Sequence, residues 1–429
     1  MVIIGLDGVP YGLLKDLAES GVMPNTRSII ENGVFRQMES TIPEISSVAW
    51  SSIITGKNPA EHGIFGFTDF PEGTYRLSFP NFNNLKVLPF WKKDSSRRSV
   101  IINVPSTFPA SEMNGVHISG FVALDLERST YPSSLIPRLK ELNYQVDVDS
   151  SKAHQSLEMF LADLDKTLKA RKAVYQYLWE KEDWQTFMLV FTGTDRLMHF
   201  LWNACEDPLH KYHTKFLDHF RQIDEIIGGI SNNIKDDDSL IMLSDHGFEA
   251  LDKNVNINYL LEQIGFLKLK QGSNKNFSDI DFGTKAFALD PARIYINLKD
   301  KYPCGSVYTE KVDGISKQLF DVFGELEVEG RKVIKKVYYK NEVFKGPFLD
   351  QAPDLVLVGE KGFNLKANIK AESLYGKNIF TGKHTQHDAF LLIKDFSNVG
   401  IMPDNPSVFD VLSVMNSSKS SKSLKSLKS

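Results

Sequence analysis

Four short apolar runs, separated by segments with helical patterns, constrain the fold of this chain most strongly. The apolar runs, read as strands, are Val2–Leu6, Arg98–Val104, Thr186–Phe191 and Ser239–Ser244. The helical segments between them are Pro10–Glu19, Ser47–Ile54, Ser156–Lys181 and Pro208–Ile230. Strands that alternate with helices are typical of a doubly wound, mostly parallel sheet with helices on both faces. The sequence therefore predicts an α/β fold.

The stretch from 254 to 370 has a different pattern. Strand-like pieces at Ala292–Asn297 and Val333–Tyr339 flank a turn at 302–305, which predicts a smaller α+β insertion that caps the site. Residues 352–358 are interpreted as a strand that returns to the core. The expected division is a core at 1–253, a cap at 254–370, a returning core segment at 371–415 and a disordered Ser/Lys tail at 416–429.

Composition excludes several classes of partner. The 429 residues carry a formal net charge of −4, so no global positive field recruits nucleic acid or an anionic membrane. No run approaches the roughly 20 apolar residues of a spanning helix, and the N-terminus lacks signal-peptide features. Cys205 and Cys304 show no paired spacing, which argues against a disulfide framework and a thiolate zinc site. We expect a cytoplasmic protein without nucleic-acid or membrane partners.

Polar side chains follow the predicted strands at the edge where α/β sheets bind ligands. Asp7 follows the first strand, and the adjacent pair Asp245 and His246 follows the fourth. Asp195 and His199, four residues apart on a helix after the third strand, would share one helix face. As alternatives, Asp7 is a turn residue, or Asp195 caps its helix while His199 packs beneath it.

A further ligand candidate comes from the C-terminal part of the chain. His384 lies in a polar turn before the apolar run Ala389–Ile393, and His387 and Asp388 nearby are alternative ligands. Two divalent ions need a mixture of carboxylates and imidazoles, as well as an open position on each ion. The candidate set supplies this mixture: Asp7, Ser46, Asp195, His199, Asp245, His246 and His384.

A serine pair opens the predicted helix at Ser47–Ile54. A serine at a helix N-terminus lies beside free backbone N–H groups, which suits an incoming phosphate, and a divalent ion can lower the pKa of its hydroxyl. The alternative is that Ser46 or Ser47 merely caps the helix. Spacing alone does not choose between the two serines.

Several motifs occur together in a fixed order. They are Asp7-Gly8, Pro43-x-x-Ser46, Thr55-Gly56-x-x-Pro59-x-x-His62-Gly63-Ile64, Asp195-x-x-x-His199, Asp245-His246-Gly247 and Gly382-x-His384. This series resembles the type I phosphodiesterase/nucleotide pyrophosphatase family of the alkaline phosphatase superfamily.

The resemblance implies a doubly wound α/β core with two zinc-like ions, although manganese or iron could use the same ligands. One ion would be bound by Asp195, His199 and His384, and the other by Asp7, Asp245 and His246. The family's offsets from Pro43 and Thr55 both indicate Ser46 as the nucleophile, which would form a phosphoseryl intermediate. The implied substrate is a small phosphoester such as a nucleotide.

Two positions depart from the family pattern. The family's nucleophile is usually Thr, whereas this chain has Ser46. Phe67 stands where nucleotide pyrophosphatases carry a phosphate-binding Asn. The candidates for substrate contact are Phe67 and Arg196, which lies inside the Asp195–His199 pair and could as easily face solvent.

Other activities stay open or are disfavoured. The alternatives are a phosphomonoesterase or phosphonate hydrolase of the same superfamily, or a non-catalytic metal-binding protein of this fold. A sulfatase is disfavoured because the Cys/Ser-x-Pro-x-Arg pattern is missing. The sequence does not indicate an oligomeric state.

Overall fold

The computed structural model describes residues 1–123, 125–235, 238–394 and 402–415. The predicted tail at 416–429 lies outside the described residues. The described residues divide into two compact units, of which the first lies within 1–57, 81–248 and 384–415 and the second lies within 58–80 and 249–383.

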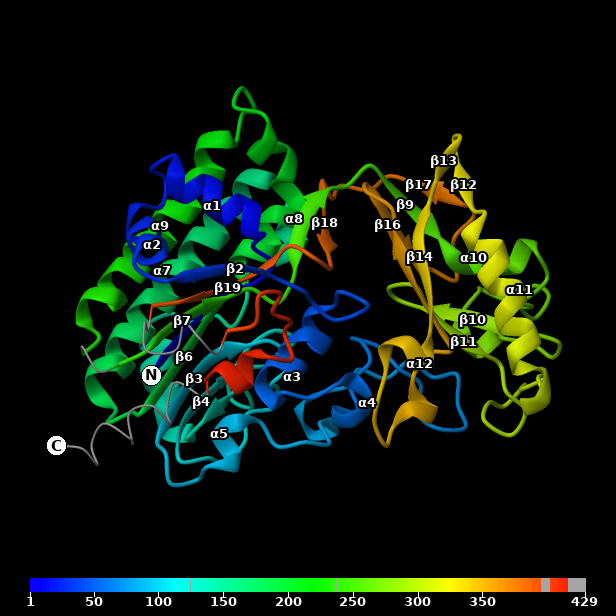
Figure 1. Cartoon of the computed structure of the whole chain (residues 1–429), viewed down its shortest axis with the longest axis horizontal. Helices are drawn as coiled ribbons and strands as arrows, with labels where there is room; N and C mark the ends of the chain where they lie inside the picture. Colours follow the sequence, from blue (N-terminus) through cyan, green and yellow to red (C-terminus); the bar gives the residue numbers. More distant parts are fainter. Residues whose placement is uncertain (124, 236–237, 395–401, 416–429) are drawn as a thin grey trace. The chain divides into compact units, whose positions relative to one another are not determined.

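The first unit contains an eight-stranded sheet with the strand order β2-β19-β7-β1-β6-β3-β4-β5 (Figure 1). Its strands are β1 (Val2–Leu6), β2 (Val34–Met38), β3 (Ser99–Val104), β4 (Gly115–Ser119), β5 (Thr130–Tyr131), β6 (Thr186–Phe191), β7 (Leu240–Leu243) and β19 (Ala389–Ile393). The five strands from β7 to β4 run parallel, which confirms the predicted mostly parallel α/β fold.

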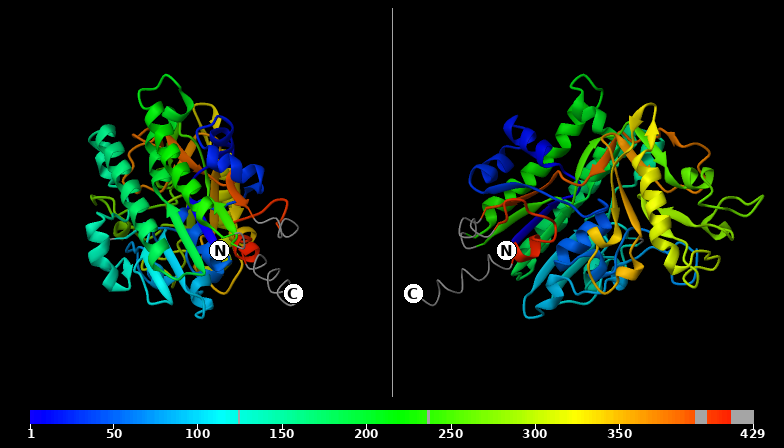
Figure 2. Two further views of the ribbon diagram at one scale, coloured as in Figure 1. Left: turned by 90° about the vertical axis from the view of Figure 1, so that its left-hand side faces the viewer. Right: turned by 45° about the vertical axis from the view of Figure 1, so that its right-hand side comes forward.

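Helices cover both faces of this sheet. The helices of the first unit are α1 (Tyr11–Glu19), α2 (Pro24–Glu31), α3 (Ser46–Thr55), α5 (Phe90–Lys93), α6 (Ile136–Glu141), α7 (Leu157–Lys181), α8 (Gly193–Glu206) and α9 (His213–Asn233). Helices α1, α2, α7, α8 and α9 contact one another on one side, with α3 and α5 on the other (Figure 1). Figure 2 shows the same elements from two further directions.

The alternation of side chains along the strands explains the two layers. Ile3, Met188 and Ile241 pack in one cluster with Trp50 and Ile53 of α3. The strand residues between them are also buried and face the opposite helix layer. Both faces of the central strands are therefore apolar, as parallel sheets require.

Strand β19 runs antiparallel to both of its neighbours, β2 and β7. Its amino end therefore lies at the same edge of the sheet as the carboxyl ends of β1, β6 and β7. Residues just before β19 and residues just after the parallel strands meet at that edge.

The second unit has its own sheets. An antiparallel sheet has the order β10-β11-β15-β14, and smaller sheets pair β16-β9-β17 and β12-β13. Its strands are β9 (Lys253–Asn256), β10 (Ala286–Leu289), β11 (Arg293–Ile296), β12 (Glu327–Val328), β13 (Arg331–Lys332), β14 (Ile334–Tyr339), β15 (Leu355–Gly359), β16 (Phe363–Lys366) and β17 (Tyr375–Gly376). Its helices are α4 (Pro59–His62), α10 (Ile257–Gln263), α11 (Val312–Gly324) and α12 (Lys340–Val343). Two further strands, β8 (Gly247–Ala250) and β18 (Gly382–Thr385), pair with each other, and each contains one boundary between the units.

The two units differ from the expected domain boundaries in two respects. The segment 352–358, expected to return to the core, forms β15 and pairs with β11 and β14 inside the second unit. Residues 58–80, expected in the core, belong to the second unit because Tyr75 packs in its apolar cluster and Thr68 O accepts from Arg293. The inserted segment is accordingly longer than 254–370 at both ends.

Across the described ranges, none of the helices is both long enough and apolar enough to cross a membrane.

Candidate active site

Six of the seven predicted ligand candidates meet at the edge of the sheet defined above. Asp7 directly follows β1, the helix α8 follows β6, and Asp245 follows β7. These three strands are neighbours and run parallel, so their carboxyl ends lie together. His384 reaches the same edge because the antiparallel strand β19 begins there.

The first cluster consists of Asp195, His199 and His384. His384 Nε2 lies 3.0 Å from both Asp195 Oδ1 and His199 Nε2, and His199 Nε2 lies 3.5 Å from Asp195 Oδ1. The N-cap of α8 is Thr192, with no side-chain cap hydrogen bond, so Asp195 does not cap the helix. Three potential ligand atoms therefore converge on one point.

The second cluster consists of Asp7, Asp245 and His246, all of them buried. His246 Nε2 lies 3.3 Å from Asp245 Oδ2 and 3.8 Å from Asp7 Oδ1. Gly8 adopts a φ of +73°, and its N–H donates to Asp245 Oδ1. A Cβ atom on Gly8 would lie 3.1 Å from the His246 ring, so the close turn after β1 requires glycine.

Ser46 joins the second cluster. Its Oγ lies 3.0 Å from His246 Nε2, and its side chain is buried at the first residue of α3. The N-cap of α3 is Ile45, so neither serine caps the helix. Ser47 Oγ has no hydrogen-bond partner within the described part of the chain. Of the two serines, the geometry brings only Ser46 to the candidate ligands.

Carbonyl groups orient two of the histidines. His384 Nδ1 lies 3.1 Å from Glu44 O, and His246 Nδ1 lies 3.0 Å from Gly247 O. An Nδ1–H that donates to a carbonyl leaves the lone pair on Nε2, which is the arrangement of a metal-binding histidine. In both residues it is Nε2 that faces the cluster.

Phe248 is a site residue that the sequence analysis missed. Its ring centroid lies 4.8 Å from that of His199, 5.1 Å from that of His384 and 6.0 Å from that of His246. It is almost fully buried and fills the space behind all three imidazoles. Its position directly after Asp245-His246-Gly247 was the only signal in the sequence.

The buried carboxylates of the two clusters favour the binding of cations. Burial, together with the carboxylates of Asp245 and Asp195, raises the pKa of Asp7 well above its usual range. Neither Asp7 Oδ1 nor Asp245 Oδ2 has a hydrogen-bond partner among the residues described. Buried carboxylate oxygens without donors are costly unless a cation meets them. The donor set of three carboxylates and three imidazoles therefore fits two divalent ions.

Asp195 differs from Asp7 in its surroundings. Burial alone would raise the pKa of Asp195, but His199, His384 and Arg196 together hold it well below its usual range. Arg196 Nη1 donates to Asp195 Oδ2 over 2.8 Å, and Arg196 Nη2 donates to Asp147 Oδ2 over 3.1 Å. The guanidinium group predicted as a weak candidate for phosphate contact is thus already paired with two carboxylates.

Two other candidates lie outside these clusters. His387 is partly exposed, and its Nδ1 lies 2.9 Å from Gln386 Oε1. Phe67 belongs to the second unit, where it is partly buried. Its role in substrate contact stays a prediction.

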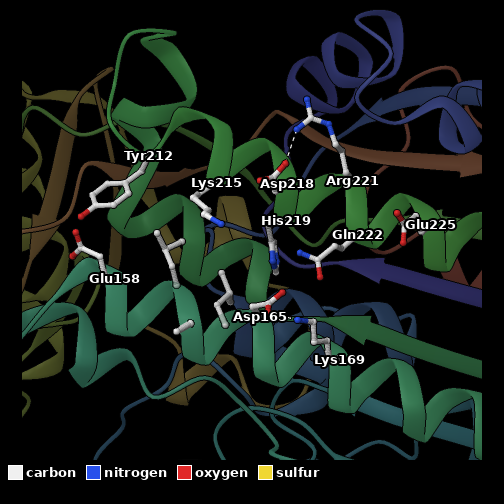
Figure 3. A pocket seen from close by; sticks show the side chains of 13 residues that line it. Glu158, Asp165, Lys169, Tyr212, Lys215, Asp218, His219, Arg221, Gln222 and Glu225 are labelled. Atoms are coloured by element: carbon white, nitrogen blue, oxygen red, sulfur yellow. Dashed lines mark hydrogen bonds and ion pairs between the residues drawn. The ribbon is translucent and has the colours of Figure 1, made fainter.

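A separate groove of about 700 Å³ lies between α7 and α9 (Figure 3). Lys169 pairs there with Asp165, and Arg221 pairs with Asp218. The residues that line this groove do not include any of the ligand candidates.

The family model for type I phosphodiesterase/nucleotide pyrophosphatase matches residues 1–386 of the chain. The chain belongs to this family. A comparison with curated protein sequences found no match. Membership of the family indicates a phosphoester hydrolase, and its members use divalent metals.

Solved structures of other proteins share the fold. Phosphonoacetate hydrolase from Sinorhizobium meliloti, in complex with phosphonoacetate, matches with a TM-score of 0.63 and 16% identity over 96% of this chain and 93% of that chain. Murine ectonucleotide pyrophosphatase/phosphodiesterase 5 matches with a TM-score of 0.55 and 14% identity over 97% of this chain and 93% of that chain. An inactive variant of the murine protein, in complex with AMP, has a TM-score of 0.54 and 14% identity over 97% of this chain and 94% of that chain. At these identities the likeness establishes the alkaline phosphatase-like fold.

Proposed function

We propose that this protein hydrolyses phosphodiester or pyrophosphate bonds, with Ser46 as the nucleophile and two divalent ions as cofactors. The observation that carries the proposal is the position of Ser46 Oγ, 3.0 Å from His246 Nε2 in one of two adjoining ligand clusters. A hydroxyl group beside converging carboxylates and imidazoles is the arrangement that metal-assisted nucleophilic catalysis needs.

Asp195, His199 and His384 would hold one ion, while Asp7, Asp245 and His246 would hold the other. When bound, the ions would supply charge that lowers the pKa of the Ser46 hydroxyl and neutralises the phosphoryl oxygens. The three imidazole ligands favour zinc, and manganese or iron are the alternatives.

The covalent steps follow from the position of Ser46 at the start of α3. Its Oγ forms a bond to phosphorus as the bond from phosphorus to the leaving-group oxygen breaks, and the proton of the Ser46 hydroxyl passes to the departing oxygen. Water then attacks the phosphoseryl group, which releases the phosphate product and returns Ser46 to its hydroxyl form. The first N–H groups of α3 have no partners within the helix, so they are suited to receive phosphoryl oxygens.

The surroundings of Arg196 support a diester over a monoester. A phosphomonoester carries an additional negative charge, which a free arginine or lysine commonly meets. Arg196 is instead paired with Asp147 and Asp195. We therefore propose a substrate with a singly charged phosphoryl centre, such as a nucleotide diester or pyrophosphate.

A phosphonate or monoester hydrolase is the second candidate. The shared fold of phosphonoacetate hydrolase, over 96% of this chain, favours it. A non-catalytic metal-binding protein is a third candidate, although the presence of a full ligand set beside Ser46 speaks against it.

A matched set of substrates tests the proposal. Initial rates are measured with bis-p-nitrophenyl phosphate, p-nitrophenyl phosphate, p-nitrophenyl TMP and phosphonoacetate, for the wild type and for Ser46→Ala. We expect the diesters to be hydrolysed fastest and Ser46→Ala to be inactive. A preference of tenfold or more for the monoester, about 1.4 kcal/mol of transition-state stabilisation, would overturn the diesterase assignment. Hydrolysis of phosphonoacetate alone would establish the second candidate.

A further inference from the structure

The carboxylate of Asp195 is shared between two sets of partners. Its Oδ1 faces His384 Nε2 at 3.0 Å, on the side of the ligand cluster. Its Oδ2 accepts from Arg196 Nη1 at 2.8 Å, on the opposite side. The guanidinium of Arg196 therefore fixes the rotation of the carboxylate and so determines which oxygen is left for an ion.

The contact between Asp195 and Arg196 is not a consequence of the helix. Side chains at neighbouring positions of an α-helix point in different directions and do not normally face each other. Arg196 turns back toward Asp195 because other groups hold its guanidinium. Asp147 Oδ2 accepts from Arg196 Nε at 3.2 Å and from Nη2 at 3.1 Å, and the Phe121 ring centroid lies 4.0 Å from Arg196 Cζ.

Asp147 is itself held in place by the first unit. Its Oδ1 accepts from Thr192 Oγ1 at 3.3 Å and from the N–H of Val148 at 2.9 Å. Arg171 Nη1 donates to the same Thr192 hydroxyl at 3.3 Å, and Arg171 Nη2 donates to Val146 O at 2.7 Å. The side chains of Asp147 and Arg196 are about one-sixth exposed, so the pair is largely shielded from water.

We propose that Asp147 is a positioning residue that acts through Arg196 to orient Asp195 as a metal ligand. This inference rests on the proposed function, since it concerns the ion held by Asp195, His199 and His384. Groups that hydrogen-bond to metal ligands set ligand orientation and charge, and their loss commonly weakens metal binding by about 10-fold to 100-fold. Removal of the Asp147 charge would also leave Arg196⁺ paired with Asp195 alone.

The experiment measures zinc affinity by competition with a chelator, with the two binding steps resolved, for the purified full chain. Asp147→Asn is expected to weaken one step by about 10-fold to 100-fold and to leave the other unchanged. Asp354→Asn is the matched control, because Asp354 is also a shielded carboxylate that pairs with a cation, Lys340, at 2.9 Å. It belongs to the second unit and should leave both affinities unchanged.

A double-mutant cycle separates positioning from a general effect on the fold. If Asp147 acts through Arg196, Asp147→Asn has no further effect on zinc affinity in an Arg196→Met background. Additive losses in the cycle would overturn the inference. Equal zinc affinities for the wild type and Asp147→Asn would overturn it as well.

A second variant and the metal binding of the wild type separate a folding defect from a failure of the inference. If Asp147→Asn does not fold, Arg196→Lys keeps the charge but cannot bridge both carboxylates with a planar fork. Weaker zinc binding by that variant supports positioning, and unchanged binding contradicts it. A wild-type chain that binds no divalent ion would overturn the proposed function together with this inference, whereas a zinc-binding wild type with an unaffected Asp147→Asn removes only the inference.

Discussion

The imidazole rings of His246 and His384 stack with their centroids 3.7 Å apart and their planes inclined by 23°. One ring belongs to each ligand cluster, so the two clusters adjoin. The ions of two-metal phosphoryl-transfer sites typically lie about 3.5–4 Å apart. The stacked pair is therefore consistent with two ions that act on one phosphoryl group, and it motivates the first two predictions.

Ser46→Ala should lower kcat by about 10³-fold or more, because it removes the proposed nucleophilic hydroxyl. Ser47→Ala is the matched control, since Ser47 Oγ has no hydrogen-bond partner in the described ranges. It should stay within about threefold of the wild type. Full activity of Ser46→Ala in a diester assay would remove Ser46 from the mechanism.

Removal of divalent ions should abolish activity and lower Tm. The buried carboxylates of Asp7, Asp245 and Asp195 repel one another, and a bound cation relieves this repulsion. An ion present at 1,000 times its Kd stabilises the folded state by about 4 kcal/mol. The measurement is Tm and initial rate before chelation, after it, and after zinc is added back. A chain that is shown to be metal-free and still turns over at the original rate would refute the cofactor assignment.

His117 should make stability depend on pH. Burial lowers the pKa of His117 from an ordinary 6.5 to about 3. The unfolded chain therefore binds a proton first as the pH falls, so the contribution of His117 lowers stability between pH 6.5 and pH 3. At pH 5 the loss relative to neutral pH is about 2 kcal/mol.

In His117→Phe, the free energy of unfolding should fall less steeply over this range than in the wild type. Urea unfolding at pH 7, 6 and 5 provides the comparison, with pH 7 as the baseline for each protein. Parallel curves for the two proteins would contradict the prediction.

Asp224 on α9 should stabilise the start of α2. Its carboxylate accepts from the backbone N–H of Asn25 at 2.9 Å and of Thr26 at 2.8 Å, as well as from the Thr26 hydroxyl at 2.7 Å. These N–H groups have no partner within α2, and the negative charge meets the positive end of the helix dipole.

Asp224→Asn should therefore cost about 2–4 kcal/mol in urea unfolding. Asp218→Asn, on the same helix, removes an exposed pair with Arg221 and should cost less than about 1 kcal/mol. Equal costs for the two variants would show that Asp224 does not cap α2.

The central strands were predictable because burial on both faces leaves an uninterrupted apolar run. Strands β1 and β6 have the predicted bounds, Val2–Leu6 and Thr186–Phe191. The same property explains the error at 352–358. An apolar run shows that a strand is buried but does not identify the sheet to which it belongs.

Other features of the fold and the site depend on tertiary contacts, which local sequence patterns do not predict. Residues 58–80 belong to the second unit because of Tyr75, whose packing partners lie far along the chain. The choice between Ser46 and Ser47 depends on the rotation of α3 about its axis, which spacing does not fix. In the sequence, Phe248 is only an aromatic residue that follows a motif. In the structure, its ring packs near three histidines.

The antiparallel direction of β19 has a consequence for biosynthesis. A ribosome completes Asp7, Ser46, Asp195 and Asp245 long before it reaches His384, which the strand direction of β19 helps to bring to the same edge. A nascent chain can therefore fold most of its sheet while one ligand cluster still lacks its third member. Full hydrolytic capacity would then arise only after His384 has been synthesised and β19 has paired with β7.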